Sequence, residues 1–537
     1  MELEKEKGIT IKLASIRLKW KECILNLIDT PGHIDFSAEV LRSLKVCEGA
    51  ILLIDVTKGV QSQTVSLFKK AREEGLYILP VLNKIDSPLA TDARIEEVRG
   101  LLEDSPYNFS HFQLISARTG RGVKDLLDYI VEKLPEHSDN RYLEKLNLPF
   151  IQAGGLCALV FEAQYSNQKG TILTIRVFSG EIKKNDEIYL VKTGVKVRVR
   201  EIEFLSPRPQ TTDRILQGEV GRIYLFLPKK VYLESGEHIV SYPPPKDSEL
   251  KLLPDTHRMG RLKPMIFSFI APFEESGREA FSTSLKSLKL SDSSFEYSFT
   301  QSSSLGFGAN IGALGPLHLE VLISRLEGEF GLKLMSGPST IEYKAQLKSG
   351  QEITFSSVDS FPDPSLVKEF LEPYIHLSLS LSPRYEKDFI SFISSRRSVS
   401  LLSIKREEEQ NLFLEYLLPL GELNSSFVHS LFAITKGYIS YSYELGEYYS
   451  LDLLKIGIFI NDVEYSELSF LSEKGEAYTR GREILLKLKN NLSAQLYELV
   501  LHAKIGGKII ARESVRSLKK DVAAKCYGGD ISRKKKL

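Results

Sequence analysis

Paired cysteines, paired histidines and long apolar runs are missing from this sequence, and each absence excludes a class of protein. The 4 cysteines lie far apart and form no CxxC pair, so the sequence predicts neither a zinc site nor a disulfide framework. The 9 histidines show no HxxxH or HExxH spacing, which argues against a metalloenzyme. No apolar run reaches the roughly 18 residues that cross a bilayer. Residues 1–7 lack the apolar core of a secretory signal. We therefore expect a soluble, intracellular protein, and 537 residues are enough for several domains.

The net charge of +1 conceals a basic carboxyl end. Between residues 504 and 537 the only acidic residues are Glu513, Asp521 and Asp530. A segment this positive suits a phosphate backbone, because each neutralised phosphate releases counterions. A solvated basic face is the alternative interpretation of the charge alone. The candidate RNA-binding residues are Lys508, Arg512, Lys525, Arg533, Lys534, Lys535 and Lys536.

The first segment, residues 1–138, alternates short apolar runs with amphipathic helical patterns. Such alternation is typical of a mostly parallel α/β sheet. We expect a hairpin-like pair of strands first, followed by single strands separated by helices. The expected strands are 9–18, 23–28, 50–54, 76–82 and 112–115. Pro, His, Ser and Asp cluster at 135–139, which indicates a domain boundary.

The remaining chain predicts four further domains. Residues 148–245 contain many short strand patterns at regular spacing, which favours a small β-barrel. The segments 262–345 and 365–445 alternate strands with helices, including a helix at 315–328, and each could form a small α+β sandwich. A last mixed segment, 446–537, runs into the basic tail.

The pentapeptide Asp29-Thr30-Pro31-Gly32-His33 directly follows the apolar strand 23–28. A carboxylate at the end of a strand can hold magnesium, and the bare backbone of Gly32 can approach a γ-phosphate. An ordinary turn is the alternative for this motif taken alone. His33 is then a candidate catalytic residue that orients or polarises the attacking water, although a lone loop histidine is usually structural. Upstream, Thr10 is a candidate second magnesium ligand in a loop that orders with the γ-phosphate.

Two more motifs follow later strands of the same predicted sheet. Asn83-Lys84-Ile85-Asp86 comes after the strand 76–82, and Ser116-Ala117-Arg118 after the strand 112–115. A carboxylate at Asp86 can accept two hydrogen bonds from the N1 and N2 edge of guanine, whereas adenine offers the opposite pattern. Backbone amides at 116–118 can contact the guanine oxygen, and Lys84 can cover the ring. Because open α/β sheets bind ligands at the carboxyl ends of their strands, the three motifs together predict a guanine-nucleotide site.

With these motifs in place, the sequence resembles the LepA (elongation factor 4) family of translational GTPases. Residues 6–12 and 29–36 are close to the pattern of that family, and the similarity continues through 39–44, 59–64 and 305–308. Three carboxyl-terminal motifs are the most specific evidence, since they match the domain that distinguishes LepA from elongation factor G. They are Arg480-Gly481-Arg482-Glu483, residues 505–512 and residues 524–536.

The resemblance implies a ribosome-dependent GTPase that uses GTP and Mg²⁺. The expected architecture is a G domain, a β-barrel, two ferredoxin-like domains and a LepA-type C-terminal domain. The family is credited with acting on stalled or mistranslocated ribosomes by moving tRNAs back by one codon, and with effects on translation under ionic stress or on initiation. Its basic tail would face ribosomal or transfer RNA. The resemblance also implies a cytoplasmic monomer, with peripheral association on the cytoplasmic face of the cell membrane.

Two features depart from the family pattern. Family members begin with a strand and a glycine-rich loop that cradles phosphates, and nothing before Lys7 can play that part. We therefore expect a G domain truncated at its first strand and P-loop, from a misplaced start or a shortened gene. Such a chain should hydrolyse little GTP unless the upstream coding segment is added. The second departure is Pro316, which a helix accepts in its first turn.

Two alternatives compete with a GTP-hydrolysing factor. A catalytically inactive ribosome- or RNA-binding remnant would keep the barrel and the basic tail without binding guanine nucleotides. Elongation factor G or a tetracycline-protection factor would need about a hundred more residues between the two α+β segments. The interval 345–364 is too short for such a domain.

Overall fold

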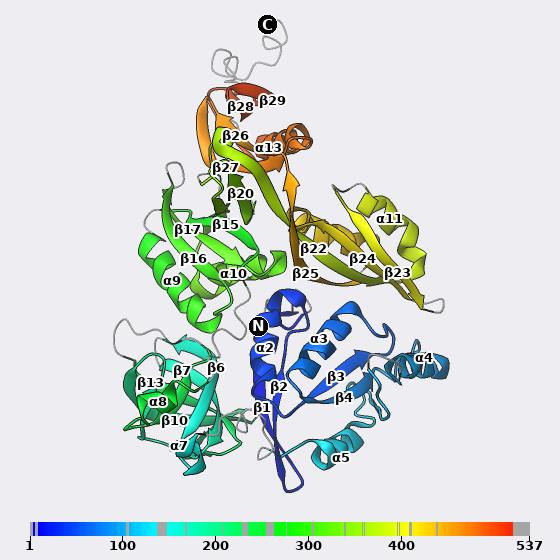
Figure 1. Ribbon diagram of the computed structural model, residues 1–537, viewed down its shortest axis with the longest axis vertical. Helices are drawn as coiled ribbons and strands as arrows, with labels where there is room; N and C mark the ends of the chain where they lie inside the picture. The colour runs from blue at the N-terminus through cyan, green and yellow to red at the C-terminus, as the bar shows by residue number, and fades with distance from the viewer. Residues whose placement is uncertain are drawn as a thin grey trace, which may run out of the picture.

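The computed structural model arranges the chain as an α/β domain, a barrel, two α+β domains and a C-terminal domain (Figure 1). It describes residues 4–5, 9–103, 107–136, 148–166, 169–206, 208–227, 233, 235–253, 263–274, 277–302, 306–337, 340–356, 358, 360–394, 396, 398–407, 411–436, 439–493 and 495–518. The C-terminal domain lies at one end of the molecule, and the first domain lies beside the barrel at the other (Figure 1). None of the helices among these residues is long and apolar enough to cross a membrane.

The strands of the first domain (9–136) form two separate sheets. Strands β1 (Ala14–Trp20) and β2 (Cys23–Asp29) make an antiparallel hairpin, whereas β3 (Gly49–Asp55), β4 (Tyr77–Asn83) and β5 (Gln113–Leu114) make a parallel sheet. Among the described residues, β2 pairs only with β1 and β3 only with β4. The β3 edge therefore leaves Leu53 57% exposed. The expected α/β sheet is therefore parallel from β3 to β5, and the expected hairpin of β1 and β2 stands apart from it.

The hairpin is held in place by side-chain contacts, since among the described residues it shares no backbone hydrogen bonds with the parallel sheet. Trp20 donates a hydrogen bond to Asp128 on α5 at 2.6 Å, and Arg17 pairs with Glu219 of the barrel at 2.7 Å. The predicted strand 9–18 was too long at its start, because residues 9–13 precede β1 and Ile11 and Leu13 are buried against other domains. The helical elements are η1 (Ile34–Phe36), α2 (Ser37–Leu44), α3 (Ser62–Glu73), α4 (Asp92–Glu103) and α5 (Val123–Lys133).

The second domain is a closed barrel, as the sequence predicts. Its sheet runs β11-β10-β13-β7-β6-β14-β9, and β9 also pairs with β10, which closes the circle. The strands alternate inward apolar residues that fill one core. Short helices α7 (Pro149–Gln152) and α8 (Asp247–Leu250) flank the barrel. Its strands are β6 (Cys157–Ser166), β7 (Gly170–Ser179), β8 (Glu181–Lys183), β9 (Glu187–Leu190), β10 (Val195–Ser206), β11 (Arg208–Thr212), β12 (Arg214–Leu216), β13 (Val220–Leu225) and β14 (His238–Ser241).

The third domain (263–341) has the ferredoxin-like order β-α-β-β-α-β with the spatial order β16-β17-β15-β18. The predicted helix at 315–328 is α10, which begins at Pro316 as its first residue. Proline is accepted there because the first helical N–H has no partner within the helix. The other elements are β15 (Ile266–Pro272), α9 (Arg278–Ser291), β16 (Glu296–Ser302), β17 (Gly306–Ala313), α10 (Pro316–Phe330), β18 (Leu334–Ser336) and β19 (Thr340–Ile341).

The fourth domain (343–451) repeats the ferredoxin-like order and extends it. Strand β22 (Val367–Leu381) pairs with β24 (Asn411–Pro419) and β25 (Ile439–Leu451), and β23 (Ser400–Glu407) lies at the edge. Helices α11 (Glu386–Ser394) and α12 (Ser425–Ile434) cover this sheet. The interval 345–364, expected as a connection, also contributes to the sheet. It contains the hairpin of β20 (Tyr343–Leu347) and β21 (Glu352–Phe355), and β20 pairs with β22.

The C-terminal domain (453–518) packs one helix on a four-stranded antiparallel sheet with the order β27-β26-β28-β29. Its elements are β26 (Leu453–Ile460), β27 (Val463–Glu473), α13 (Ala477–Asn491), β28 (Leu499–Ile505) and β29 (Lys508–Val515).

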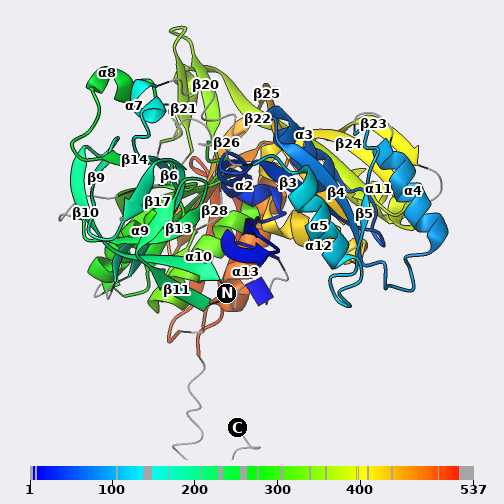
Figure 2. The same cartoon turned by 90° about the horizontal axis from the view of Figure 1, so that it is seen from below.

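Several domains meet around η1 and α2. Helix α10 of the third domain contacts η1, α3 contacts β25 of the fourth domain, and β1 contacts β10 of the barrel. Seen from below, α2 lies between the barrel on one side and β3 and β4 on the other (Figure 2). The loop that follows β2 is thus enclosed by parts of the chain that are distant in sequence.

Candidate functional site

The base-recognition motifs meet at the carboxyl ends of β4 and β5. Asn83 ends β4, and its Oδ1 accepts hydrogen bonds from the Lys84 N–H at 2.8 Å and the Ala117 N–H at 3.0 Å. These two bonds use the amide oxygen of Asn83 and not its NH₂ group. The structure therefore brings the two predicted motifs into direct contact.

Asp86 presents an exposed carboxylate at this edge. Its Oδ1 accepts a hydrogen bond from the Ser116 hydroxyl at 2.7 Å. This bond lowers the pKa of Asp86, and the positive charges of Arg118 and Lys84 act in the same direction. An ionised carboxylate with free lone pairs can accept two hydrogen bonds from one base edge.

An ion pair holds the side chain of Lys84 at the carboxyl end of β3. Its backbone is left-handed, with φ of 67°, and its Nζ pairs with Asp55 Oδ2 at 2.7 Å. Asp55 ends β3, and its other oxygen accepts from the backbone and hydroxyl of Thr57. Sequence reasoning missed Asp55, although it is a carboxylate at the end of an apolar strand, which is the same signal that indicated Asp29.

Residues 29–35 form a second group, which follows β2 and contacts the third and fourth domains. Asp29 ends β2, and partial burial raises its pKa above the ordinary value, with the charge of Glu4 acting in the same direction. Among the residues that the structure describes, nothing lies within 4 Å of the position that a Cβ on Gly32 would occupy, so this backbone is open to an approaching ligand. Thr10 is half-buried between Ile9 and Ile11, which pack against η1 and α10.

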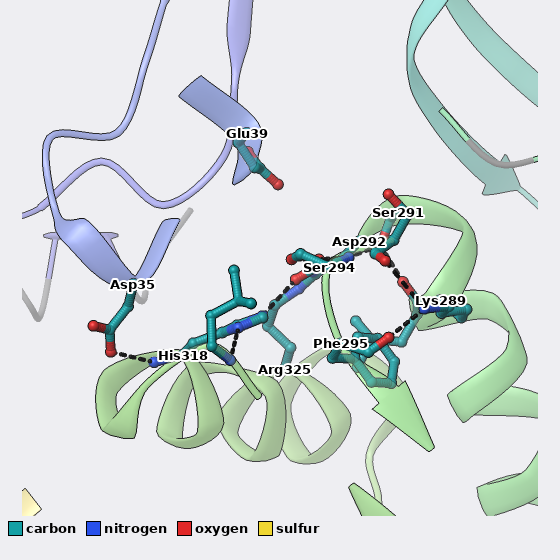
Figure 3. Close-up of polar contacts among 12 residues, drawn as sticks. Asp35, Glu39, Lys289, Ser291, Asp292, Ser294, Phe295, His318 and Arg325 are labelled. Carbon is teal, nitrogen blue, oxygen red and sulfur yellow. Dashed lines mark hydrogen bonds and ion pairs between the residues drawn. The ribbon is translucent and has the colours of Figure 1, made fainter. Parts of the chain in front are cut away.

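His33 is buried at the contact with the fourth domain. Its Nε2 lies 3.0 Å from the hydroxyl oxygen of Tyr441 on β25, and its Nδ1 accepts from the Asp35 N–H at 3.2 Å. Asp35 itself is only 1% exposed and reaches α10 of the third domain (Figure 3). Sequence reasoning assigned no role to Asp35, Tyr441 or Tyr443, because their contacts join residues that are far apart in the chain.

Three protein-family models match the chain, in the same order as its domains. The model of the elongation factor Tu GTP binding domain matches residues 1–136, that of elongation factor Tu domain 2 matches 170–237, and that of the GTP-binding protein LepA C-terminus matches 460–537. Elongation factor 4 of Thermotoga maritima is 36% identical over 546 residues, which cover 100% of this chain and 84% of that protein. The chain belongs to the elongation factor 4 family of translational GTPases.

Other relatives agree with this assignment. Elongation factor 4 of Mycoplasma mobile is 35% identical over 544 residues, covering 100% of this chain and 87% of that protein, and that of Campylobacter hominis is 37% identical over 547 residues, covering 100% and 88%. A crystal structure from Thermus thermophilus aligns with a TM-score of 0.55 and 16% identity over 84% of this chain and 91% of that one. This structural likeness shows the fold alone.

Family membership makes the first domain a GTPase domain, whereas the individual site residues stay predictions. Among the residues that the structure describes, no group of three or more His, Cys, Asp or Glu side chains could hold a metal ion. This does not conflict with the predicted Mg²⁺, which usually takes one or two protein ligands and completes its shell with phosphates and water.

The predicted RNA-binding residues are only partly described. Lys508 begins β29, and Arg512 lies four residues along the same strand; both are exposed. Lys525 and residues 533–536 lie outside the described residues.

Proposed function

We propose that the edge formed by Asn83–Asp86 and Ser116–Arg118 binds the guanine base of GTP. The observation that supports this most directly is the exposed, ionised Asp86 carboxylate fixed by Ser116. Its oxygens suit the two donors of the guanine N1 and N2 edge, while the Asn83 NH₂ group suits an acceptor on the opposite edge. In the present conformation the Ala117 N–H donates to Asn83 and the Ser116 N–H donates to the Arg121 carbonyl oxygen, so the proposed contact to the guanine oxygen is left to the Arg118 N–H.

The proposal extends to the phosphate end of the nucleotide. Asp29 and Thr10 supply the magnesium ligands, Gly32 lies against the γ-phosphate, and His33 orients the attacking water. The nearby negative charges of Asp29 and Glu4 favour a divalent cation, which would relieve their repulsion. Bound Mg²⁺ would neutralise charge on the phosphates during hydrolysis.

An equilibrium titration tests the nucleotide assignment. The protein is mixed with fluorescent GTP, GDP and ATP analogues, with and without Mg²⁺, and binding is followed by anisotropy. We expect binding of both guanine nucleotides, weaker binding without Mg²⁺, and no competition by ATP. Equal affinity for ATP and GTP would overturn the base assignment. Ribosome binding without any nucleotide binding would instead favour the catalytically inactive ribosome- or RNA-binding remnant.

We further propose that the chain acts on ribosomes that are stalled or mistranslocated, moving their tRNAs back by one codon. Support comes from the family and from the exposed basic residues of β29, which suit a phosphate backbone. Primer-extension toeprinting of post-translocation complexes tests this step. Protein and GTP together should move the ribosome edge upstream by one codon, whereas an unchanged edge would contradict it.

Replacing both Lys508 and Arg512 with Ala tests the RNA contact. If each contacts one phosphate, the double variant should lower the slope of log affinity against log salt by about 2. Lys368→Ala is the matched control, since Lys368 is an exposed lysine of the fourth domain. Affinity for ribosomes is measured by pelleting at several salt concentrations. An unchanged slope would remove these two residues from the RNA interface.

The same proposal includes a cytoplasmic monomer that associates peripherally with the cytoplasmic face of the cell membrane. Family resemblance alone supports these points. Sedimentation analysis and cell fractionation with a salt wash would test them.

A further inference from the structure

Asp35 of the first domain caps a helix of the third domain. The N-cap residue of α10 is Gly315, which has no side chain to cap with, and Pro316 has no N–H. Asp35 Oδ2 instead accepts from the N–H groups of Leu317 at 2.8 Å and His318 at 3.2 Å (Figure 3). A carboxylate is favourable here because the helix N-terminus carries unsatisfied donors and partial positive charge.

The backbone at Gly315 is what admits this carboxylate. A Cβ at Gly315 would lie 2.4 Å from the carboxylate carbon and both oxygens of Asp35. The second oxygen of Asp35 accepts from the Tyr443 hydroxyl at 2.9 Å. Asp35 is therefore fixed by the third and the fourth domains at once, and the loop that carries His33 is fixed with it.

The contacts of His33 favour one tautomer. Asp35 Oδ1 lies 3.5 Å from Nδ1, but the Asp35 N–H donates to that nitrogen at 3.2 Å, which favours a neutral ring with its hydrogen on Nε2. Nε2 then donates to the Tyr441 hydroxyl oxygen at 3.0 Å. In this arrangement neither ring nitrogen has a free lone pair, so His33 can donate a hydrogen bond but cannot take a proton from water.

Tyr441 and Tyr443 reach the loop together because residues two apart on a strand share a face. Both belong to β25, and both are buried, which raises the pKa of each phenol with help from the charge of Asp35. Their hydroxyls therefore stay protonated. The fourth domain thus presents two neutral hydroxyls, one to the His33 ring and one to the Asp35 carboxylate.

We propose that Asp35 and Tyr441 are positioning residues for His33, holding it as the Nε2–H tautomer with that hydrogen turned toward the fourth domain. A displacement of the fourth domain away from the first breaks the Tyr441 bond and frees the Nε2–H to orient water at a γ-phosphate. The fourth domain then controls the reactive orientation of His33. The consequence for hydrolysis rests on the proposed function, whereas the tautomer and its partners do not.

The test is an NMR spectrum of the imidazole groups in protein labelled with ¹⁵N and ¹³C histidine. His33 is assigned by its loss in His33→Gln. We expect the Nε2–H tautomer for His33 in the unmodified chain. Tyr441→Phe keeps the ring packing but removes the acceptor, so its Nε2–H should exchange with water at least about tenfold faster. Tyr385→Phe, at a buried tyrosine of the same domain, is the control and should leave the His33 signals unchanged.

Asp35→Ala provides a second, independent variant. Without its carboxylate the loop loses its anchor to α10, and His33 should populate both tautomers. The proposal is overturned if His33 is doubly protonated or Nδ1-protonated at neutral pH in the unmodified chain. It is also overturned if Tyr441→Phe leaves the Nε2–H exchange unchanged.

Hydrolysis assays separate this inference from the proposed function. If the chain hydrolyses GTP, Tyr441→Phe should raise the ribosome-free kcat by about tenfold with an unchanged KM. An unchanged kcat would contradict control by the fourth domain. Absence of hydrolysis in every form would defeat the proposed function, while the imidazole spectra would still decide the positioning of His33.

Discussion

The predicted base-recognition cluster, which consists of Asn83, Asp86 and Ser116, and the loop 29–35 are held by contacts of very different range. Asn83, Asp86 and Ser116 bond to one another across neighbouring strand ends, within 34 positions of the chain. The loop is held by α10 and β25, at separations of 282 to 408 positions. A site held locally is complete within the first domain, whereas the geometry of the loop depends on how the domains are arranged.

The largest expected effect concerns the locally held cluster. Asp86→Asn replaces an acceptor with a donor opposite the guanine N1 and N2 edge, so guanine affinity should fall by about a thousandfold or more, with a shift toward xanthine nucleotides. Fluorescent-nucleotide titration measures this, with Asp92→Asn on the exposed start of α4 as the control. Unfolding by urea should be unchanged. A comparable loss of stability would show that Asp86 is structural.

A smaller effect, on the free energy of unfolding, is expected from replacing Glu39 of α2, which lies at the domain interface. Burial raises the pKa of Glu39 to about 7, partly opposed by Arg42, with the charges of Asp292 and Glu162 acting to raise it and the Leu13 N–H to lower it. Because the folded-state pKa of Glu39 is above its unfolded-state value, protonated Glu39 contributes to folding stability. This contribution is fully present below about pH 4.5 and is lost as pH rises through 7.

Glu39→Gln should therefore be more stable than the unmodified chain above pH 7, by up to about 3 kcal/mol, with the difference vanishing near pH 4.5. Glutamine can still accept the hydrogen bond from Leu13, which is 3.2 Å from Glu39 Oε2. Urea unfolding at several pH values measures the difference. Glu73→Gln, at an exposed position of α3, is the control and should show no such trend. A pH-independent difference would contradict the buried, protonatable Glu39.

Gly315→Ala should lower the stability of the chain by about 1 to 3 kcal/mol, because its Cβ displaces the Asp35 carboxylate. Gly328→Ala is the matched control in the same helix, where no described residue lies within 4 Å of the added Cβ, and it should stabilise α10 by up to about 1 kcal/mol. Thermal unfolding compares the two. Nucleotide-base affinity should survive Gly315→Ala, and its loss would show that the two regions are not independent.

Local patterns account for much of what could be predicted. Apolar runs bounded by turn residues located β2, β3 and β4, and β2 and β4 end in the polar residues that the motifs require, Asp29 and Asn83. The start of β1 could not be predicted, because whether a segment such as 9–13 pairs as a strand depends on the domains packed against it.

Sequence alone determined the order of the domains, the polar residues at the strand ends and the helix that begins at Pro316. These follow from hydrophobic periodicity and from turn chemistry, which act over a few residues. The tertiary structure alone decided that Asp35 caps α10, that His33 forms a hydrogen bond with Tyr441 and that Glu39 is buried. Such contacts join residues far apart in the chain, and no local sequence pattern predicts which distant surfaces will pack together.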